Sequence, residues 1–265
     1  MSVRVARDGP IARVALSRPE ARNAFDDGLI GELTAAFLSF VEDRETRVVL
    51  LSGDGPVFCA GADAAWMRKA GSYSRAENEE DAGRMARMFR AIDACPRPVI
   101  ALVQGAAIGG GVGLAAAADI AIAAEGTVFS LAEVKLGILP SVISPYVLRA
   151  IGPRQARHLF LTGDRFDAAE ARRIGLVHEV VPAGELEEAG ARKAASLLTS
   201  GPEAMEAAKK LIAEVAGQKP EDAMPLTVRT LAERRASEEA KEGLTAFLEK
   251  RSPNWAVRPG PRSKV

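Results

Sequence analysis

Residues 3–16 alternate between apolar and polar side chains around a turn at Asp8-Gly9-Pro10. This pattern is typical of a β-hairpin in which each strand buries one face. Asp26 or Asp27 then precedes apolar residues at helical spacing, which predicts a capped amphipathic helix. The apolar, β-branched run at 47–53 predicts a buried strand. The chain is therefore expected to begin with the order strand, strand, helix, strand.

The middle of the chain keeps switching between strand-like and helix-like patterns. We expect strands at 99–105, 120–123, 127–130 and 176–182, and helices around Trp66, after Asn78, around 147–148 and 156–159, and at 166–173. The polar stretch 72–78 is typical of a loop, either a mobile lid or a surface excursion without function. Alternation of strands and helices favours an α/β fold with parallel strand pairing.

From Glu185 onward the strand pattern disappears, and charged residues are interspersed among apolar ones at helical spacing. We therefore predict an α/β core over residues 1–195 and a helical region over 196–265. Because helices with apolar residues on more than one side need partners, this second region is expected to mediate homo-oligomerisation. The end of the chain, from Pro259-Gly260-Pro261, is expected to be disordered.

Composition argues against several classes of function. The chain has 35 Lys and Arg residues and 35 Asp and Glu residues, so no net field would gather nucleic acid or an anionic membrane. Cys59 and Cys95 are too few for a disulfide framework, and the two histidines lack metal-ligand spacing. Arg4, Arg7 and Asp8 stand where a signal peptide would have its apolar core, so we expect a cytoplasmic protein without a metal centre.

Residues 99–118 combine a predicted strand, five glycines and a run of alanines. A strand that leads through a glycine loop into a helix presents free backbone N–H groups at the positive end of the helix dipole. Such groups can hold an oxygen that becomes negative. Three other interpretations stay open: a membrane span, because Gln104 is the one strongly polar residue in 20 positions; a dinucleotide fingerprint at 111–116; or close backbone packing without chemistry.

Glu133 lies among leucine and valine neighbours. Such a setting disfavours the ionised form and is expected to raise the pKa of the carboxyl, which could then take and give a proton near neutrality. Glu133 and Lys135 could equally be an ordinary exposed charge pair. Two stretches that offer backbone donors, 60–62 and 109–111, favour the first interpretation. Together with the carboxyl they suit a reaction in which a carbonyl oxygen becomes an enolate and a proton moves.

Four motifs, spread over almost the whole chain, identify it as a member of the crotonase, or enoyl-CoA hydratase/isomerase, superfamily. They are Arg18-Pro19…Asn23-Ala24-Phe25, Phe58-Cys59-Ala60-Gly61-Ala62-Asp63, Gln104-Gly105…Gly109-Gly110-Gly111 and Ala132-Glu133-Val134-Lys135-Leu136-Gly137. The resemblance implies a spiral of ββα units with a C-terminal helical trimerisation region, assembled as a trimer or as a hexamer of two trimers. The implied ligand is an acyl-CoA thioester substrate. Coenzyme A is part of that substrate, so no separate cofactor is expected.

The same resemblance assigns roles to particular residues. The backbone N–H groups of Ala62 and Gly110 would form an oxyanion hole for the thioester carbonyl, and Glu133 would be the catalytic glutamate. The implied contacts with coenzyme A come from Arg22 and Ala24 at the nucleotide and its phosphates, Ala60 and Asp63 along the pantetheine, and Phe247 and Lys250 of a neighbouring subunit.

Gly113 departs from the family pattern. Family hydratases with two glutamates carry the other one where this chain has Gly113, 20 positions before Glu133 (133 − 113 = 20). A lone glutamate is the arrangement of family isomerases, so a Δ3,Δ2-enoyl-CoA isomerase is an alternative. A non-catalytic acyl-CoA-binding protein is a second alternative, because a decaying site would also lose a carboxylate.

Further motifs resemble bacterial methylglutaconyl-CoA hydratases of leucine and isoprenoid breakdown. These motifs lie at 62–67, 138–147 and 242–255. We therefore favour a hydratase that acts on a branched or dicarboxylic, 3-methylglutaconyl-CoA-like thioester through an enolate held in the oxyanion hole. Ser141, Ser144 and Tyr146, or the space beside Gly113, could hold the water or a distal carboxylate. The three polar residues, like Asp63, are equally explained as turn and helix-cap residues.

Overall fold

The computed structural model describes residues 1–256 and is built around a six-stranded sheet in the order β1-β2-β3-β4-β6-β9. β1 (Val3–Asp8) and β2 (Ile11–Leu16) form the predicted hairpin. The parallel part of the sheet consists of β2 with β3 (Val48–Gly53), β4 (Val99–Val103), β6 (Ile120–Ala124) and β9 (Glu179–Val181). Parallel pairing across most of the sheet confirms the expected α/β class.

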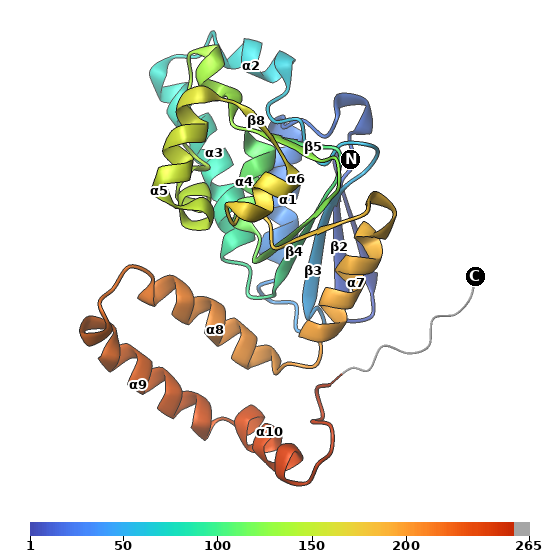
Figure 1. Ribbon diagram of the computed structural model, residues 1–265, viewed down its shortest axis with the longest axis vertical. Coiled ribbons are helices and arrows are strands. Elements are labelled where there is room, and N and C mark those ends of the chain that lie inside the picture. Colours follow the sequence, from blue (N-terminus) through green and yellow to red (C-terminus); the bar gives the residue numbers. More distant parts are fainter. Residues whose placement is uncertain (257–265) are drawn as a thin grey trace.

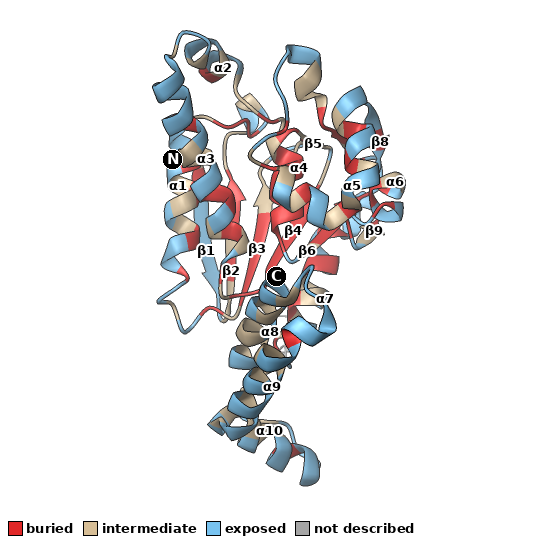
Figure 2. Ribbon diagram, turned by 90° about the vertical axis from the view of Figure 1, so that its left-hand side faces the viewer, coloured by how far each residue is buried: buried red, intermediate tan, exposed pale blue. Residues whose placement is uncertain are grey.

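Alternate side chains of β4 enter two different hydrophobic clusters. Val99, Ala101 and Val103 pack with the helices α1 (Asp27–Ser39), α3 (Arg75–Asp93) and α4 (Gly110–Ala117). Ile100 and Leu102 pack on the other face with α7 (Leu186–Leu197). Figure 2 shows the buried central strands between these two layers. Because helices cover both faces, β4 is apolar at every position.

A second, three-stranded sheet has the order β5-β7-β8 and corrects two expectations. Its strands are β5 (Ala106–Ile108), β7 (Val128–Ser130) and β8 (Arg165–Asp167). The first of them was expected to be loop, and Phe166 was expected to be helical. Phe166 instead pairs with Phe129, and their stacked rings lie 5.6 Å apart between centroids. The expected helix therefore shortens to α6 (Ala168–Arg173).

The polar stretch 72–78 is mostly helix, so its expectation as a loop was wrong. α3 begins at Arg75, because Ser74 and Glu77 form a capping box that satisfies backbone N–H groups at its start. α2 (Ala64–Ala70) precedes it. α5 (Ser144–Thr162) is interrupted at Gly152, where φ is 72°, and so contains the two expected helical segments. Short 3-10 helices lie at η1 (Pro19–Ala21), η2 (Ala132–Leu136) and η3 (Ala183–Glu185).

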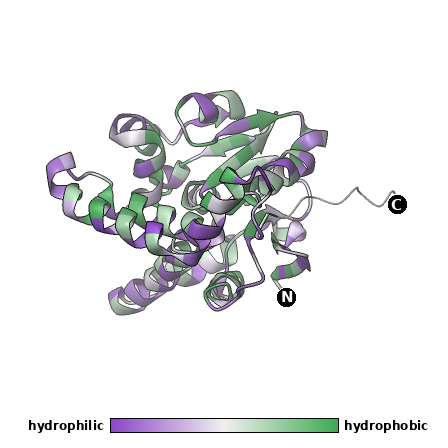
Figure 3. Ribbon diagram, turned by 90° about the horizontal axis from the view of Figure 1, so that it is seen from below, coloured by the Kyte–Doolittle hydropathy of each residue, from purple (hydrophilic) through white to green (hydrophobic). Residues whose placement is uncertain are grey.

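Three C-terminal helices project from the core (Figure 1). They are α8 (Pro202–Val215), α9 (Pro220–Ala236) and α10 (Glu238–Leu248), and we call them the arm. Seen from below in Figure 3, hydrophobic and hydrophilic residues are interspersed on these helices. The predicted boundary at residue 195 lies near the end of α7, which packs on the sheet. The segment from Pro259-Gly260-Pro261 lies outside the described residues.

Residues 99–118 do not form a membrane span. They fold into β4, β5 and α4, and across residues 1–256 no helix is both long and apolar enough to cross a bilayer. The dinucleotide interpretation of 111–116 is also wrong, because Gly111 and Gly113 lie buried inside α4 and not in a loop. The small residues therefore serve close packing and the start of a helix.

Candidate active site

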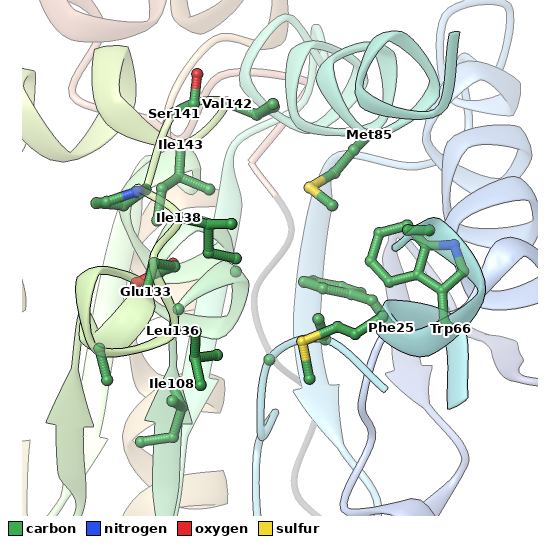
Figure 4. Close-up of a pocket in the computed structure, with 18 of the residues that line it drawn as sticks. Phe25, Trp66, Met85, Ile108, Glu133, Leu136, Ile138, Ser141, Val142 and Ile143 are labelled. Atoms are coloured by element: carbon green, nitrogen blue, oxygen red, sulfur yellow. The ribbon is translucent and has the colours of Figure 1, made fainter. Parts of the chain in front are cut away.

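A cavity of about 750 Å³ opens between α2, α3 and the segment 132–143. Figure 4 shows Glu133, Ile138 and Ile143 on one side of it and Phe25, Trp66 and Met85 on the other. Glu133 and the exposed Arg68 are the ionisable side chains that line it. The cavity thus suits an apolar group that must meet one carboxyl.

An isolated parallel β-bridge between Phe25 and Ala62 positions the backbone N–H of Ala62. Phe25 N–H donates to Gly61 O at 2.7 Å, and Asp63 N–H donates to Phe25 O at 2.9 Å. Because successive amides of an extended chain point to opposite edges, the N–H of Ala62 points away from Phe25. Ala62 lines the cavity, and no protein acceptor for its N–H is found between residues 1 and 256.

The second backbone donor lies at the start of α4. Gly110 is the first residue of this helix, so its N–H has no intrahelical partner and lies at the positive end of the helix dipole. A Cβ at Gly110 would lie 2.2 Å from Cε2 of Phe25. Only glycine therefore fits there, and Gly110 lines the cavity together with Ala62.

The carboxyl of Glu133 lies against this glycine turn. A Cβ at Gly109 would lie 2.8 Å from Oε1 of Glu133, so only a residue without a side chain lets the carboxyl come so close to Gly109. Oε2 is buried, with no hydrogen-bond partner among the described residues. Burial raises the pKa of the Glu133 carboxyl, as its apolar neighbours led us to expect. Lys135 is exposed, whereas Glu133 is half-buried with its Oε2 atom shielded from solvent, so Glu133 does not belong to an exposed charge run.

Ser130 connects the glycine turn to the segment that carries Glu133. Gly109 N–H donates to Ser130 O at 2.8 Å, and Ser130 Oγ donates to Gly163 O at 3.3 Å. Ser130 ends β7, and η2 with Glu133 begins two residues later. The backbone donor and the carboxyl are therefore held by one short piece of chain.

Gly113 faces hydrophobic atoms and not polar ones. A Cβ at this position would lie 2.3 Å from Cγ2 of Ile143 and 2.9 Å from Cε1 of Phe89. The space beside Gly113, where a second carboxylate would start, is thus already filled by apolar side chains. The three described atoms nearest to that Cβ position are all carbons, of Ile143 and Phe89.

Four of the six residues predicted to hold coenzyme A lie in or beside the segment 60–62, namely Arg22, Ala24, Ala60 and Asp63. Ala60 lines the cavity, and its N–H donates to the carbonyl of Arg22 at 3.0 Å. The Arg22 side chain is exposed, whereas Ala24 is buried and its carbonyl accepts from Arg18 at 2.6 Å. Arg22 and Ala24 do not line the cavity but lie next to it in the chain that pairs with its wall.

Asp63 is the N-cap of α2, as its alternative interpretation supposed. Its carboxylate accepts from the N–H groups of Ala65 and Trp66 and forms a 3.3 Å ion pair with Arg18. The hydrogen bond from Ala65, more than the charge of Arg18, lowers the pKa of Asp63 below its ordinary value. The carboxylate therefore stays ionised and fixes the start of α2 beside Ala62.

Of the remaining predicted residues, Ser141 lines the cavity and the others do not. Ser141 lies exposed at its rim, whereas Ser144 and Tyr146 do not line it. Ser144 starts α5, and the ring of Tyr146 packs on Phe89 with centroids 5.9 Å apart. Phe247 and Lys250 lie at the end of the arm, away from the cavity of their own chain (Figure 1).

Two residues at or beside the cavity, Asn23 and Ile143, received no role in the sequence analysis. Asn23 is fully buried, accepts from Arg18 N–H, and donates to the carbonyls of Asp54 and Val57, so it shapes the turn beside the cavity. Its φ of 55° is one that Asn tolerates better than most residues, which was the available signal. Nothing in the sequence around Ile143 indicates its position, because that position is defined by its contact with Gly113 of a different helix.

An α/β fold in which two backbone N–H groups and one buried carboxyl face an apolar cavity is typical of enzymes that stabilise an enolate. Comparison with known proteins identifies the family. The profile described as Enoyl-CoA hydratase/isomerase matches residues 6–258, and this chain belongs to that family. The expected spiral α/β fold with C-terminal helices is thereby confirmed.

Individual relatives span nearly the whole chain. The carnitinyl-CoA dehydratase of Salmonella typhi is 36% identical over 265 residues, covering 97% of this chain and 99% of the relative. The crystal structure of an enoyl-CoA hydratase from Shewanella pealeana has 40% identity and a TM-score of 0.93, with 96% of both chains covered. The structure of Pseudomonas aeruginosa AtuE has 36% identity and a TM-score of 0.93, covering 97% of this chain and 100% of that one.

Proposed function

We propose that this protein is an enoyl-CoA hydratase, which adds water across the 2,3 double bond of an enoyl-CoA thioester. The observation that carries the proposal is that the Glu133 carboxyl lies against Gly109 and lines the same cavity as Gly110, the next residue, which supplies a backbone donor. The names of the relatives from Salmonella typhi and Shewanella pealeana support it.

In the proposed reaction the thioester carbonyl accepts hydrogen bonds from the N–H groups of Ala62 and Gly110. Ionised Glu133 takes a proton from water while the water oxygen bonds to the third acyl carbon. The electron pair of the double bond moves towards the carbonyl, whose oxygen becomes negative and is stabilised by the two N–H groups. Glu133 then returns a proton to the second carbon, which completes the addition of one water.

The acyl group proposed here is branched or dicarboxylic. The mostly apolar lining of the cavity supports a branched hydrocarbon chain. For a dicarboxylic chain, Arg68, Ser141, Asn78 and the Nε1–H of Trp66 are donors in the cavity lining that could meet a distal carboxylate. Leucine breakdown, as the source of such thioesters, is part of the same proposal.

Coenzyme A enters this proposal as part of the substrate. Arg22 and Ala24 would hold its nucleotide end, and Ala60 and Asp63 would flank the pantetheine beside the cavity. Phe247 and Lys250 would reach the site from a neighbouring subunit of a trimer or of a hexamer. A cytoplasmic location is also proposed.

One observation favours a second candidate, a Δ3,Δ2-enoyl-CoA isomerase. Ile143 and Phe89 occupy the space beside Gly113, so Glu133 has no carboxylate partner with which to hold a water. A single carboxyl is sufficient to take a proton from the second carbon of a 3-enoyl thioester and return it to the fourth.

The test is mass spectrometry of enoyl-CoA thioesters incubated in water labelled with oxygen-18. The substrates would include 3-methylcrotonyl-CoA, 3-methylglutaconyl-CoA and a 3-enoyl-CoA. A hydratase yields a product heavier by one labelled water. We expect Glu133→Gln to lower its formation on the order of 10³-fold, because the variant cannot accept a proton.

Glu125→Gln serves as the matched control, because Glu125 is exposed and lies outside the cavity. Its rate should equal that of the wild type. Migration of the double bond without added water would replace the hydratase by the isomerase. If no thioester changes, the protein is a non-catalytic acyl-CoA-binding protein, and equal rates for wild type and Glu133→Gln would refute the role of Glu133.

A further inference from the structure

Ile143 occupies a position that the proposed reaction does not use. We propose that Ile143, packed against Gly113, sets the acyl specificity of the site by limiting the bulk that a substrate carries at its third and fourth carbons. This inference rests on the proposed function, which places the thioester carbonyl at Ala62 and Gly110. It concerns which acyl groups fit, not how water is added.

Ile143 and any side chain at position 113 exclude each other. The Cγ2 atom of Ile143 lies 2.3 Å from where a Cβ at Gly113 would be, far below an ordinary contact. Ile143 is 3% exposed and lines the cavity. The side chain of Ile143 thus occupies the space that a side chain at position 113 would take, and it forms an apolar part of the cavity wall.

Ile143 is held in place by its backbone and by its neighbours. Its carbonyl accepts the N–H groups of Tyr146 and Val147 at 3.1 Å each, so the first turn of α5 holds its backbone. Phe89 fills the same space beside Gly113, is fully buried and makes ring contacts with Phe25 and Tyr146. Packed interiors yield little, so added bulk in the substrate would meet a fixed surface.

The position of Ile143 along the cavity identifies the part of the substrate that it faces. Gly113 lies three residues beyond Gly110 in α4, about 4.5 Å along the helix axis. An acyl chain reaches a similar distance from its carbonyl within about three C–C bonds of roughly 1.5 Å. In Figure 4, Ile143 lies on the same side of the cavity as Glu133, facing Met85 across it. Substituents at the third and fourth carbons would therefore meet Ile143.

Steady-state kinetics with thioesters of increasing bulk test this inference. We would measure kcat/KM for crotonyl-CoA, 3-methylcrotonyl-CoA and 3-ethyl-2-pentenoyl-CoA with wild type, Ile143→Val and Ile143→Ala. One carbon in a hydrophobic pocket changes kcat/KM by about 10-fold or more. Ile143→Ala should therefore raise the ratio of the bulkiest substrate to crotonyl-CoA at least about 10-fold. Ile143→Val, which keeps Cγ2 and loses only Cδ1, should raise it less.

The matched control is Ile151→Ala, which truncates a buried isoleucine of the same helix that does not line the cavity. It should leave the substrate ratio unchanged even if it lowers stability. Each ratio comes from one preparation, so partial unfolding cancels. Ratios at the wild-type value in both Ile143 variants, or an equal rise in Ile151→Ala, would overturn the inference.

Failure of the proposed function is distinguishable from failure of this inference. If the wild type turns over none of the thioesters, the dissociation constants of butyryl-CoA and isovaleryl-CoA are measured by calorimetry. A gain in relative affinity for isovaleryl-CoA in Ile143→Ala supports the size limit without the hydratase. An unchanged relative affinity overturns it.

Discussion

The core and the arm both contain helices with apolar residues, but the core helices bury these residues and the arm helices leave most of them exposed. In the core, α1 buries Leu29, Ile30, Leu33 and Phe37 on one face. In the arm, α8 buries no residue, and α9, which is 17 residues long, buries only Ala223. Figure 2 shows this contrast as a largely exposed arm below a core with a buried centre.

The contrast indicates which parts of the protein are complete in one chain. Ala62, Gly110 and Glu133 are positioned by backbone pairing and close packing within the core. Large apolar side chains of the arm remain exposed, among them Ile212, Met224, Val228, Leu231, Leu244, Phe247 and Leu248. Because helices in proteins gain most of their stability from packing, the arm is expected to be covered by further copies of the chain.

The largest expected effect compares one phenylalanine from each region. Phe37 is fully buried and packs edge to face on Phe40, so Phe37→Ala should lower the free energy of unfolding by about 4 kcal/mol. Phe247 is 79% exposed, and Phe247→Ala should change the stability of a separate subunit by less than about 0.5 kcal/mol. Urea unfolding at two protein concentrations measures both.

Assembly is the property that Phe247→Ala should alter. Sedimentation velocity is expected to show the wild type as a trimer or hexamer and the variant shifted towards smaller species. A wild type that sediments as a monomer at all concentrations would contradict the expected role of the arm.

A smaller effect compares two glycines with positive φ. Gly109 in the core has φ 52° and Gly217 in the arm has φ 79°. Alanine at Gly217 should cost about 1–2 kcal/mol of backbone strain. Alanine at Gly109 should cost more, because its ψ of −113° lies outside the left-handed helical region. Only at Gly109 would the new Cβ displace the Glu133 carboxyl, so Gly109→Ala should also lower kcat by about 10²-fold. Equal kcat values for the two variants would show that the position of Glu133 does not depend on Gly109.

The smallest effect concerns two carboxyls whose pKa values shift in opposite directions. Burial raises the pKa of Glu133, so its ionisation destabilises the fold as the pH rises through the raised pKa. Glu133→Gln should therefore be more stable than wild type near neutral pH, with the difference vanishing below the ordinary pKa of Glu. Activity that needs the ionised form should fall as the pH drops through the same raised value.

Whereas the pKa of Glu133 is raised, that of Glu242 in the arm is lowered. Its hydrogen bonds with Arg251, and then with the Asn254 N–H, lower its pKa to about 2. Its contribution to stability is present above the ordinary pKa of Glu and is lost as the pH falls towards about 2, so Glu242→Gln should be slightly less stable at neutral pH. The unfolding free energies of wild type, Glu133→Gln and Glu242→Gln, measured from roughly pH 3 to 8, test both expectations. If the two variants differ from wild type with the same dependence on pH, the opposite pKa shifts are refuted.

Local patterns were sufficient for much of the fold. The hairpin around Gly9, the helix capped by Asp26 and the apolar strand β4 all follow from residue spacing and caps within a few positions. The start of α3 was also encoded locally, because Ser74 and Glu77 have capping-box spacing, but their polar neighbours concealed it. β5 and β8 were missed because strands of three residues form only against a partner elsewhere in the chain.

The sequence by itself determined the family and the absence of a carboxylate at Gly113, because these depend on which residues are present. It left the setting of Glu133 open, and the tertiary structure buried the Oε2 atom of its carboxyl. The tertiary structure decided what fills the space at Gly113. Ile143 comes from the start of a different helix, and only packing of α5 against α4 brings its Cγ2 to that position. Contacts between distant segments depend on how whole elements dock, which residue spacing along the chain does not specify.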